Sequence, residues 1–110
     1  MAEAVSAVVT GAAMGMGKAI SAKLVADGVV VAGLDRDQAA LEEAAAELGD
    51  AFVPVAGDVG DWAAHERAAE AAEARAPLRH WVNNAGSDIA SPAHEAKAIS
   101  LRLVPSSRSQ

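Results

Sequence analysis

The sequence contains no cysteine and no tyrosine, and only 3% of its residues are aromatic. Without cysteine the chain forms no disulfides, and it has no thiolate that could act as a nucleophile or bind a metal ion. Its histidines, His65, His80 and His94, fall on separate predicted elements without ligand spacing, so we expect no metal site. No apolar run approaches the roughly 20 residues that cross a bilayer. The first predicted strand starts near Val5, which leaves no room for a targeting peptide.

Positive charge is also scarce. Nine Lys and Arg residues against 15 Asp and Glu residues give a formal net charge of −6. Nucleic acids and anionic membranes bind basic surfaces, so we expect neither as a partner. The length of 110 residues and the hydrophobic content of 52% are typical of one globular domain. The composition therefore indicates a soluble, cytoplasmic protein.

Short apolar runs alternate with helical patterns along most of the chain. The predicted strands cover residues 5–10, 29–34, 51–55 and 78–83, and the predicted helices cover 15–26, 37–48 and 61–75. The connections suit a parallel sheet, and right-handed crossovers give the strand order 3-2-1-4. This pattern predicts an α/β fold with a partial, doubly wound sheet of the Rossmann type. Pro54 favours an edge for the third strand, and the fourth strand is left as an open edge.

The character of the sequence changes after residue 86. Residues 1–86 contain thirteen acidic and six basic residues, whereas residues 87–110 contain two acidic and three basic ones. Serine rises from two residues to six across the same boundary. We therefore predict a boundary near residue 86, between an α/β region over 1–86 and an atypical, partly disordered tail over 87–110. The periodicity of 92–104 fits a helix, but residues 99–104 also alternate like a strand.

A glycine-rich turn follows the first predicted strand, with glycines at positions 11, 15 and 17 of "VVTGAAMGMGKAI". Glycines allow a sharp turn and a close approach to a pyrophosphate, and a helix N-terminus attracts phosphate. The spacing G-x3-G-x-G differs from the general fingerprint G-x-G-x-x-G. On the glycines alone, a tight turn without a ligand therefore remains an alternative. The tetrapeptide "NNAG" at 83–86 follows the fourth strand and falls at the same crevice, where the strand order reverses.

The segment "TGAAMGMG" at 10–17 resembles the TGxxxGxG motif of the short-chain dehydrogenase/reductase family. Three further matches follow in order: "VAGLDR" at 31–36, "GDV" at 57–59 and "NNAG" at 83–86. The resemblance covers residues 4–86, the cofactor-binding half of that family's domain. It implies a nicotinamide dinucleotide cofactor and an oxidoreductase activity. The cofactor-binding positions that it implies are Gly11, Met14, Gly15, Met16, Gly17, Asp35, Arg36, Asp58, Val59, Asn83, Asn84, Ala85 and Gly86.

Within that resemblance, residues 11–17 form the turn that faces the pyrophosphate. Asp35 accepts hydrogen bonds from the adenosine ribose and repels a 2′-phosphate, which favours NAD over NADP. The neighbouring Arg36 weakens this preference, because a guanidinium pairs with phosphate. An alternative role for Asp35 is the N-cap of the second helix, for which Asp37 is better placed.

The remaining positions of the resemblance serve the two ends of the cofactor. Asp58 would bind the adenine amino group beside the Val59 backbone, although a turn residue is the alternative interpretation. "NNAG" resembles the segment in which an asparagine steadies the turn after the fourth strand and an Ala-Gly pair lets the nicotinamide ribose approach. Met14 and Met16 depart from the family's usual residues. We expect Trp62 and Trp81 to be packing residues.

No catalytic residue is predicted. The family moves its proton through a Tyr-x-x-x-Lys motif, and here Ala93 stands four residues before Lys97. The serines of the tail do not supply the family's catalytic serine, because the strand that would carry it is missing. We interpret the chain as the dinucleotide-binding half of such an oxidoreductase, truncated or read out of frame after about Ser87. One alternative is a non-catalytic nucleotide- or partner-binding module that associates through its open sheet edge, for example as a homo-oligomer. The other is an enzyme completed by a second chain.

Overall fold

Strands and helices alternate along residues 3–84, the part of the chain that the computed structural model describes. The elements are β1 (Ser6–Thr10), α1 (Gly15–Ala26), β2 (Val30–Asp35), α2 (Gln38–Leu48), β3 (Phe52–Ala56), α3 (Trp62–Glu73) and β4 (Leu78–Val82). Every element predicted in this part is present. The ends differ by a residue or two; α3, for example, stops before Arg75, whose amide donates to the Ala72 carbonyl in a tighter final turn. Ala85, Gly86 and the predicted tail lie outside the described residues.

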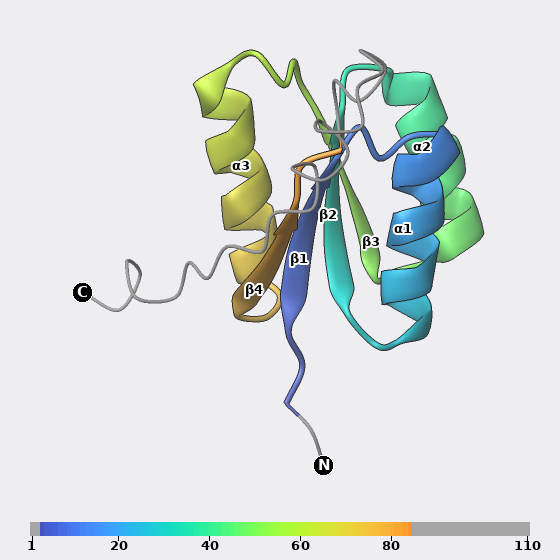
Figure 1. Cartoon of the computed structure of the whole chain (residues 1–110), viewed down its shortest axis with the longest axis vertical. Coiled ribbons are helices and arrows are strands. Elements are labelled where there is room, and N and C mark those ends of the chain that lie inside the picture. The colour runs from blue at the N-terminus through green and yellow to red at the C-terminus, as the bar shows by residue number, and fades with distance from the viewer. Residues whose placement is uncertain (1–2, 85–110) are drawn as a thin grey trace, which may run out of the picture.

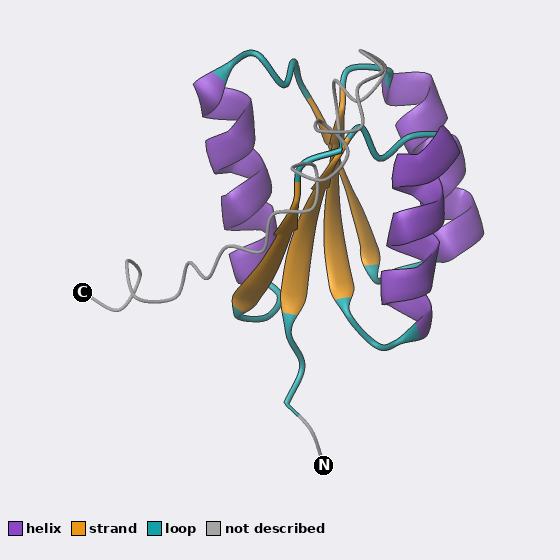
Figure 2. Ribbon diagram, in the orientation of Figure 1, coloured by secondary structure: helices purple, strands orange, loops and turns teal. Residues whose placement is uncertain are grey.

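The four strands form one parallel sheet in the order β3-β2-β1-β4, which confirms the predicted topology. Figure 1 shows α3 on one face of the sheet and α1 with α2 on the other, the doubly wound arrangement. Figure 2 shows the same layers as one sheet between helices. Pro54 lies on the edge strand β3, opposite Gly33, where a missing amide donor is tolerated. β4 is the other edge of the described sheet.

The core lies in two layers because neighbouring residues of each strand point to opposite faces. Val9 belongs to the layer under α1 and α2, whereas Val8 belongs to the layer under α3. The buried face of α3 consists of alanines, Ala64, Ala68 and Ala72, so this helix lies close to the sheet. Within residues 3–84, no helix combines the length and apolar character needed to cross a membrane.

Side-chain caps fix where two of the helices begin. Asp37 accepts a hydrogen bond from the amide of Ala40 at 3.0 Å, and Asp61 accepts one from Ala63 at 3.1 Å. The first contact confirms the predicted N-cap of the second helix, and Asp61 caps α3 in the same way. The start of α1 differs, because Met14 occupies the cap position and makes no side-chain hydrogen bond there.

Candidate functional site

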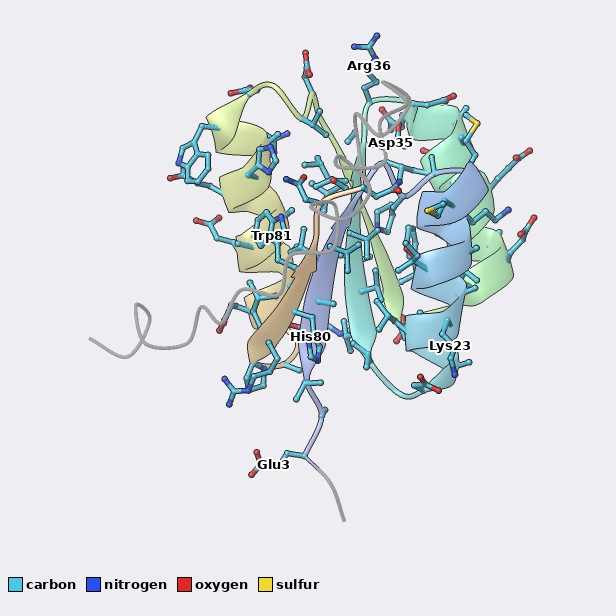
Figure 3. The ribbon with its side chains drawn as sticks, viewed as in Figure 1. Glu3, Lys23, Asp35, Arg36, His80 and Trp81 are labelled. Atoms are coloured by element: carbon cyan, nitrogen blue, oxygen red, sulfur yellow. The ribbon has the colours of Figure 1, made fainter. Side chains whose placement is uncertain are left out.

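The loops that follow the strands meet at one end of the molecule, the upper end in Figure 1. Figure 3 shows Asp35 and Arg36 at this end, opposite Glu3 and Lys23. The glycine turn follows β1, and the two asparagines follow β4. Because β1 and β4 are neighbours in the sheet, residues far apart in sequence converge there. In parallel α/β sheets, ligands bind outside these carboxyl ends.

The backbone of the glycine turn requires glycine at specific positions. Gly11 and Gly15 have φ values of 65° and 63°, in the left-handed region that other residues rarely adopt. A Cβ atom at Gly17 would overlap the Gly11 carbonyl oxygen, so the start of α1 packs directly on the turn. The Gly11 amide donates to the Leu34 carbonyl at 2.8 Å, which attaches the turn to β2. The turn is therefore a tightly fixed backbone feature.

The first turn of α1 presents unpaired backbone donors. Within residues 3–84, the amides of Gly15, Met16 and Gly17 donate to no acceptor. The side chains of Met14 and Met16 are 57% and 62% exposed and leave these amides uncovered by a polar cap. Unpaired amides and the partial positive charge of a helix N-terminus together favour an anion.

Asp35 ends β2 beside this turn and braces it. Its Oδ2 accepts a hydrogen bond from the Ala13 amide at 3.0 Å, and its Oδ1 accepts one from the Asp37 amide at 3.1 Å. It does not cap α2, since Asp37 does so. The neighbouring Arg36 is exposed, and Figure 3 shows its side chain directed away from the sheet.

Asn83 and Asn84 tie the segment after β4 to the end of β1. The Asn84 side chain is buried, and its Nδ2 donates to the Gly11 carbonyl oxygen at 3.2 Å. The Thr10 hydroxyl donates to Oδ1 of Asn83 at 3.1 Å. These bonds hold the turn after β4 against the end of β1 and the glycine turn.

Asp58 lies in the loop between β3 and α3. Its Oδ1 accepts a hydrogen bond from the Gly60 amide at 2.8 Å, and its carbonyl accepts one from the Asp61 amide at 2.8 Å. The side chain thus makes the local turn contact of the alternative interpretation. Its Oδ2 accepts no hydrogen bond within the described part of the chain. A second function for this carboxylate is therefore compatible with the turn.

Two side chains of α3 hold the same loop, a role that the sequence did not predict. Nε2 of His65 lies 2.6 Å from the Val59 carbonyl oxygen, and the Arg67 guanidinium donates to the Ala56 carbonyl at 2.8 Å. Both bonds join a helix to the backbone before it, and no local sequence pattern signals such contacts. Trp81 packs against the core under α3, as predicted, whereas Trp62 is 72% exposed and is not a core residue.

Taken together, the site offers backbone amides for an anion, carboxylates for hydroxyl or amino groups, and a buried asparagine. Among the described residues, no three His, Asp or Glu side chains gather in a way that would hold a metal ion. The donors and acceptors present are suited to binding a phosphorylated, hydroxylated molecule. They include no tyrosine, since the whole sequence lacks this residue.

Comparison with known proteins agrees with this arrangement. The chain is 44% identical over 79 residues to cis-2,3-dihydrobiphenyl-2,3-diol dehydrogenase of Rhodococcus globerulus, covering 71% of this chain and 28% of that protein. It is 44% identical over 81 residues to galactitol 2-dehydrogenase (L-tagatose-forming) of Cereibacter sphaeroides, covering 73% and 32%. The chain thus spans about a third or less of the length of these relatives.

Solved structures show the same similarity. A 3-hydroxyacyl-CoA dehydrogenase type-2 from Mycobacterium avium aligns with a TM-score of 0.68 and 35% identity, covering 71% of this chain and 31% of that one. A short-chain dehydrogenase/reductase from Burkholderia phymatum, in complex with NAD, aligns with a TM-score of 0.67 and 30% identity, covering 74% and 30%. The family model for short chain dehydrogenases matches residues 5–102. The chain belongs to the short-chain dehydrogenase family.

Proposed function

We propose that this chain binds a nicotinamide dinucleotide at the carboxyl end of its sheet, as the cofactor-binding part of an oxidoreductase. The observation that carries the proposal is the convergence of three features on one turn: the uncapped N-terminus of α1, Asp35 from β2 and Asn84 from beyond β4. The complex of the Burkholderia phymatum protein with NAD supports it. So does the structure of a 3-ketoacyl-(acyl-carrier-protein) reductase from Brucella melitensis with NADH, at a TM-score of 0.58 and 30% identity. We further propose residues 1–86 as the dinucleotide-binding region and 87–110 as an atypical tail.

The groups present fit the chemistry of such a cofactor. The amides of residues 15–17 would bind the pyrophosphate, which is the anion that the start of α1 favours. Asp35 would accept hydrogen bonds from the adenosine ribose, and Asp58 with the Val59 backbone would bind the adenine. The segment that begins at Asn83 would face the nicotinamide ribose. When bound, the cofactor supplies a nicotinamide ring that accepts or donates hydride.

Asp35 also supports a preference for NAD over NADP. A carboxylate at the ribose repels the second negative charge that a 2′-phosphate would bring. Arg36 is exposed and free to turn toward a phosphate, but its side chain points away from the sheet in Figure 3. We therefore propose NAD as the cofactor, with NADP binding more weakly.

Titration calorimetry on the 110-residue chain tests this proposal, with NAD, NADP and nicotinamide mononucleotide as ligands. We expect one site for NAD, weaker binding of NADP, and no formation of NADH from added alcohols, since the chain has no tyrosine. A folded, monodisperse sample that binds no nucleotide would refute the proposal.

The position of β4 at an edge of the described sheet supports a second proposal, association through that strand. An edge strand exposes backbone donors and acceptors that pair with another strand. Light scattering across a range of concentrations should show a mass above that of one chain. A monomer at every concentration would remove this possibility.

A further inference from the structure

An aromatic stack connects the start of α3 to β4. The imidazole of His65 lies between the indoles of Trp62 and Trp81, with ring centroids 5.8 and 5.9 Å away and interplanar angles of 25° and 17°. Figure 3 shows Trp81 on the face of the sheet that α3 covers. The outer indole is itself held, because Nε1 of Trp62 donates to Glu66 at 3.0 Å. The His65 ring is therefore fixed by side chains from two separate elements.

Among the described residues, the imidazole makes one polar contact, which is to the backbone of the loop before α3. Nε2 of His65 lies 2.6 Å from the Val59 carbonyl oxygen. A carbonyl oxygen only accepts hydrogen bonds, so Nε2 carries the hydrogen and donates it. This bond fixes the peptide plane between Val59 and Gly60. The adjacent turn is closed by bonds of Asp58 to the amides of Gly60 and Asp61.

We propose that His65 is a positioning residue for the adenine end of the cofactor. By holding the Val59 carbonyl, it sets the direction of the backbone groups beside Asp58 that would meet the adenine ring. The stack on Trp62 and Trp81 keeps the imidazole from rotating away from this bond. The inference rests on the proposed binding of a nicotinamide dinucleotide, and it assigns to His65 no contact with the cofactor.

Two substitutions separate this role from simple packing. His65→Phe keeps a ring between the two indoles but has no donor for the Val59 carbonyl. His65→Gln keeps an amide donor but removes the ring. Glu70→Gln, an exposed change on the same helix, serves as the matched control.

The first measurement is the affinity for adenosine monophosphate and for nicotinamide mononucleotide, by titration calorimetry on the full chain. Loss of one hydrogen bond that positions a ligand corresponds to about a fivefold change in affinity. We expect His65→Phe to weaken the affinity for adenosine monophosphate about fivefold. The affinity for nicotinamide mononucleotide should stay unchanged. His65→Gln should recover most of the loss, and the control should match the wild type. Equal affinities for adenosine monophosphate in His65→Phe and the wild type overturn the inference, as does an equal loss for both mononucleotides.

The second measurement needs no nucleotide. Hydrogen exchange at the amides of Gly60 and Asp61 reports whether the loop is held. We expect faster exchange in His65→Phe than in His65→Gln or the control, and unchanged exchange overturns the inference. If the wild type binds neither mononucleotide, the proposed function fails and the adenine role fails with it. If the wild type binds both and His65→Phe does not differ, the proposed function stands and the role of His65 alone is refuted.

Tryptophan fluorescence adds a signature that packing alone would not give. The chain has two tryptophans and no tyrosine, and both tryptophans belong to this stack. Adenosine monophosphate should change the emission of the wild type through the Val59–His65 bond. We expect the change to disappear in His65→Phe, and its persistence there contradicts the proposal.

Discussion

Replacement of Gly17 by alanine is the most direct perturbation of the candidate cofactor site. A Cβ atom at this position would overlap the Gly11 carbonyl oxygen and lie 2.7 Å from both the Gly11 carbonyl carbon and Nδ2 of Asn84. Carbon atoms in contact ordinarily stay about 3.5 Å or more apart, so one partner must move by about 1 Å. The Gly11 carbonyl has little freedom to move, because the amide of the same residue is bound to the Leu34 carbonyl.

The cost follows from these contacts. Forcing an added methyl into such a fixed site costs about 1–3 kcal/mol. The shift also strains the hydrogen bond from Asn84 to Gly11, which contributes about 1 kcal/mol. Alanine is a better helix former than glycine by about 1 kcal/mol in a helix interior, and this gain offsets part of the loss. We therefore expect Gly17→Ala to lower the free energy of unfolding by about 1–3 kcal/mol, with a fall in Tm of roughly 10 °C.

Thermal and urea denaturation followed by circular dichroism measure the stability, and calorimetry measures the affinity for NAD. The matched control is Gly28→Ala, at the other end of α1, where φ is 89° and no atom lies within 4 Å of the added Cβ. In this control the free energy of unfolding should fall by about 1 kcal/mol through backbone strain alone. Its affinity for NAD should be that of the wild type. A Gly17→Ala variant with wild-type stability and affinity would contradict the reasoning, because the overlap with Gly11 would then be without consequence.

Two further predictions concern other single contacts. Asp35→Asn removes the negative charge beside the proposed ribose site, so the ratio of NADP to NAD affinity should rise; an unchanged ratio in competitive calorimetry would count against the assigned role. Ser6→Ala removes a buried hydrogen bond from the Ser6 hydroxyl to the Ala76 carbonyl at 2.8 Å. It should lower the unfolding free energy measured in urea by about 1 kcal/mol, and a variant as stable as the wild type would show that this bond contributes nothing.

Most of the fold was predictable because its signals are local. Apolar runs mark the strands, and residues such as Asp37 and Asp61 mark helix starts through bonds to amides a few positions ahead. The strand order then follows from the handedness of short crossovers. The register of β4 was not predictable in the same way. Its register against β1 shifts between Ser6 and Ala7, and a bulge of this kind carries no sequence signature here.

The sequence predicted where in the fold the candidate site lies, but it did not predict which residues contact one another there. The motif positions fall where the strands end, and this follows from topology. The contacts of Asn84 with Gly11 and of His65 with Val59 depend on how elements pack, and no spacing in the sequence encodes them. Met14 is a further example. The motif marks this position, but its exposed side chain makes no cap hydrogen bond, and only the backbone beside it is placed to bind an anion.

Two residues that the sequence assigned to the cofactor also hold the protein together, and these functions are compatible. Asp35 has about four acceptor positions as a carboxylate, and within residues 3–84 it uses two of them, for the amides of Ala13 and Asp37. Asn84 has two donor hydrogens and uses one on Gly11 within the described residues. Each therefore retains hydrogen-bonding capacity for a ligand while it braces the turn. Because these bonds hold the turn from both sides, the backbone of the proposed site has its shape without a ligand, which would lower the ordering cost of binding.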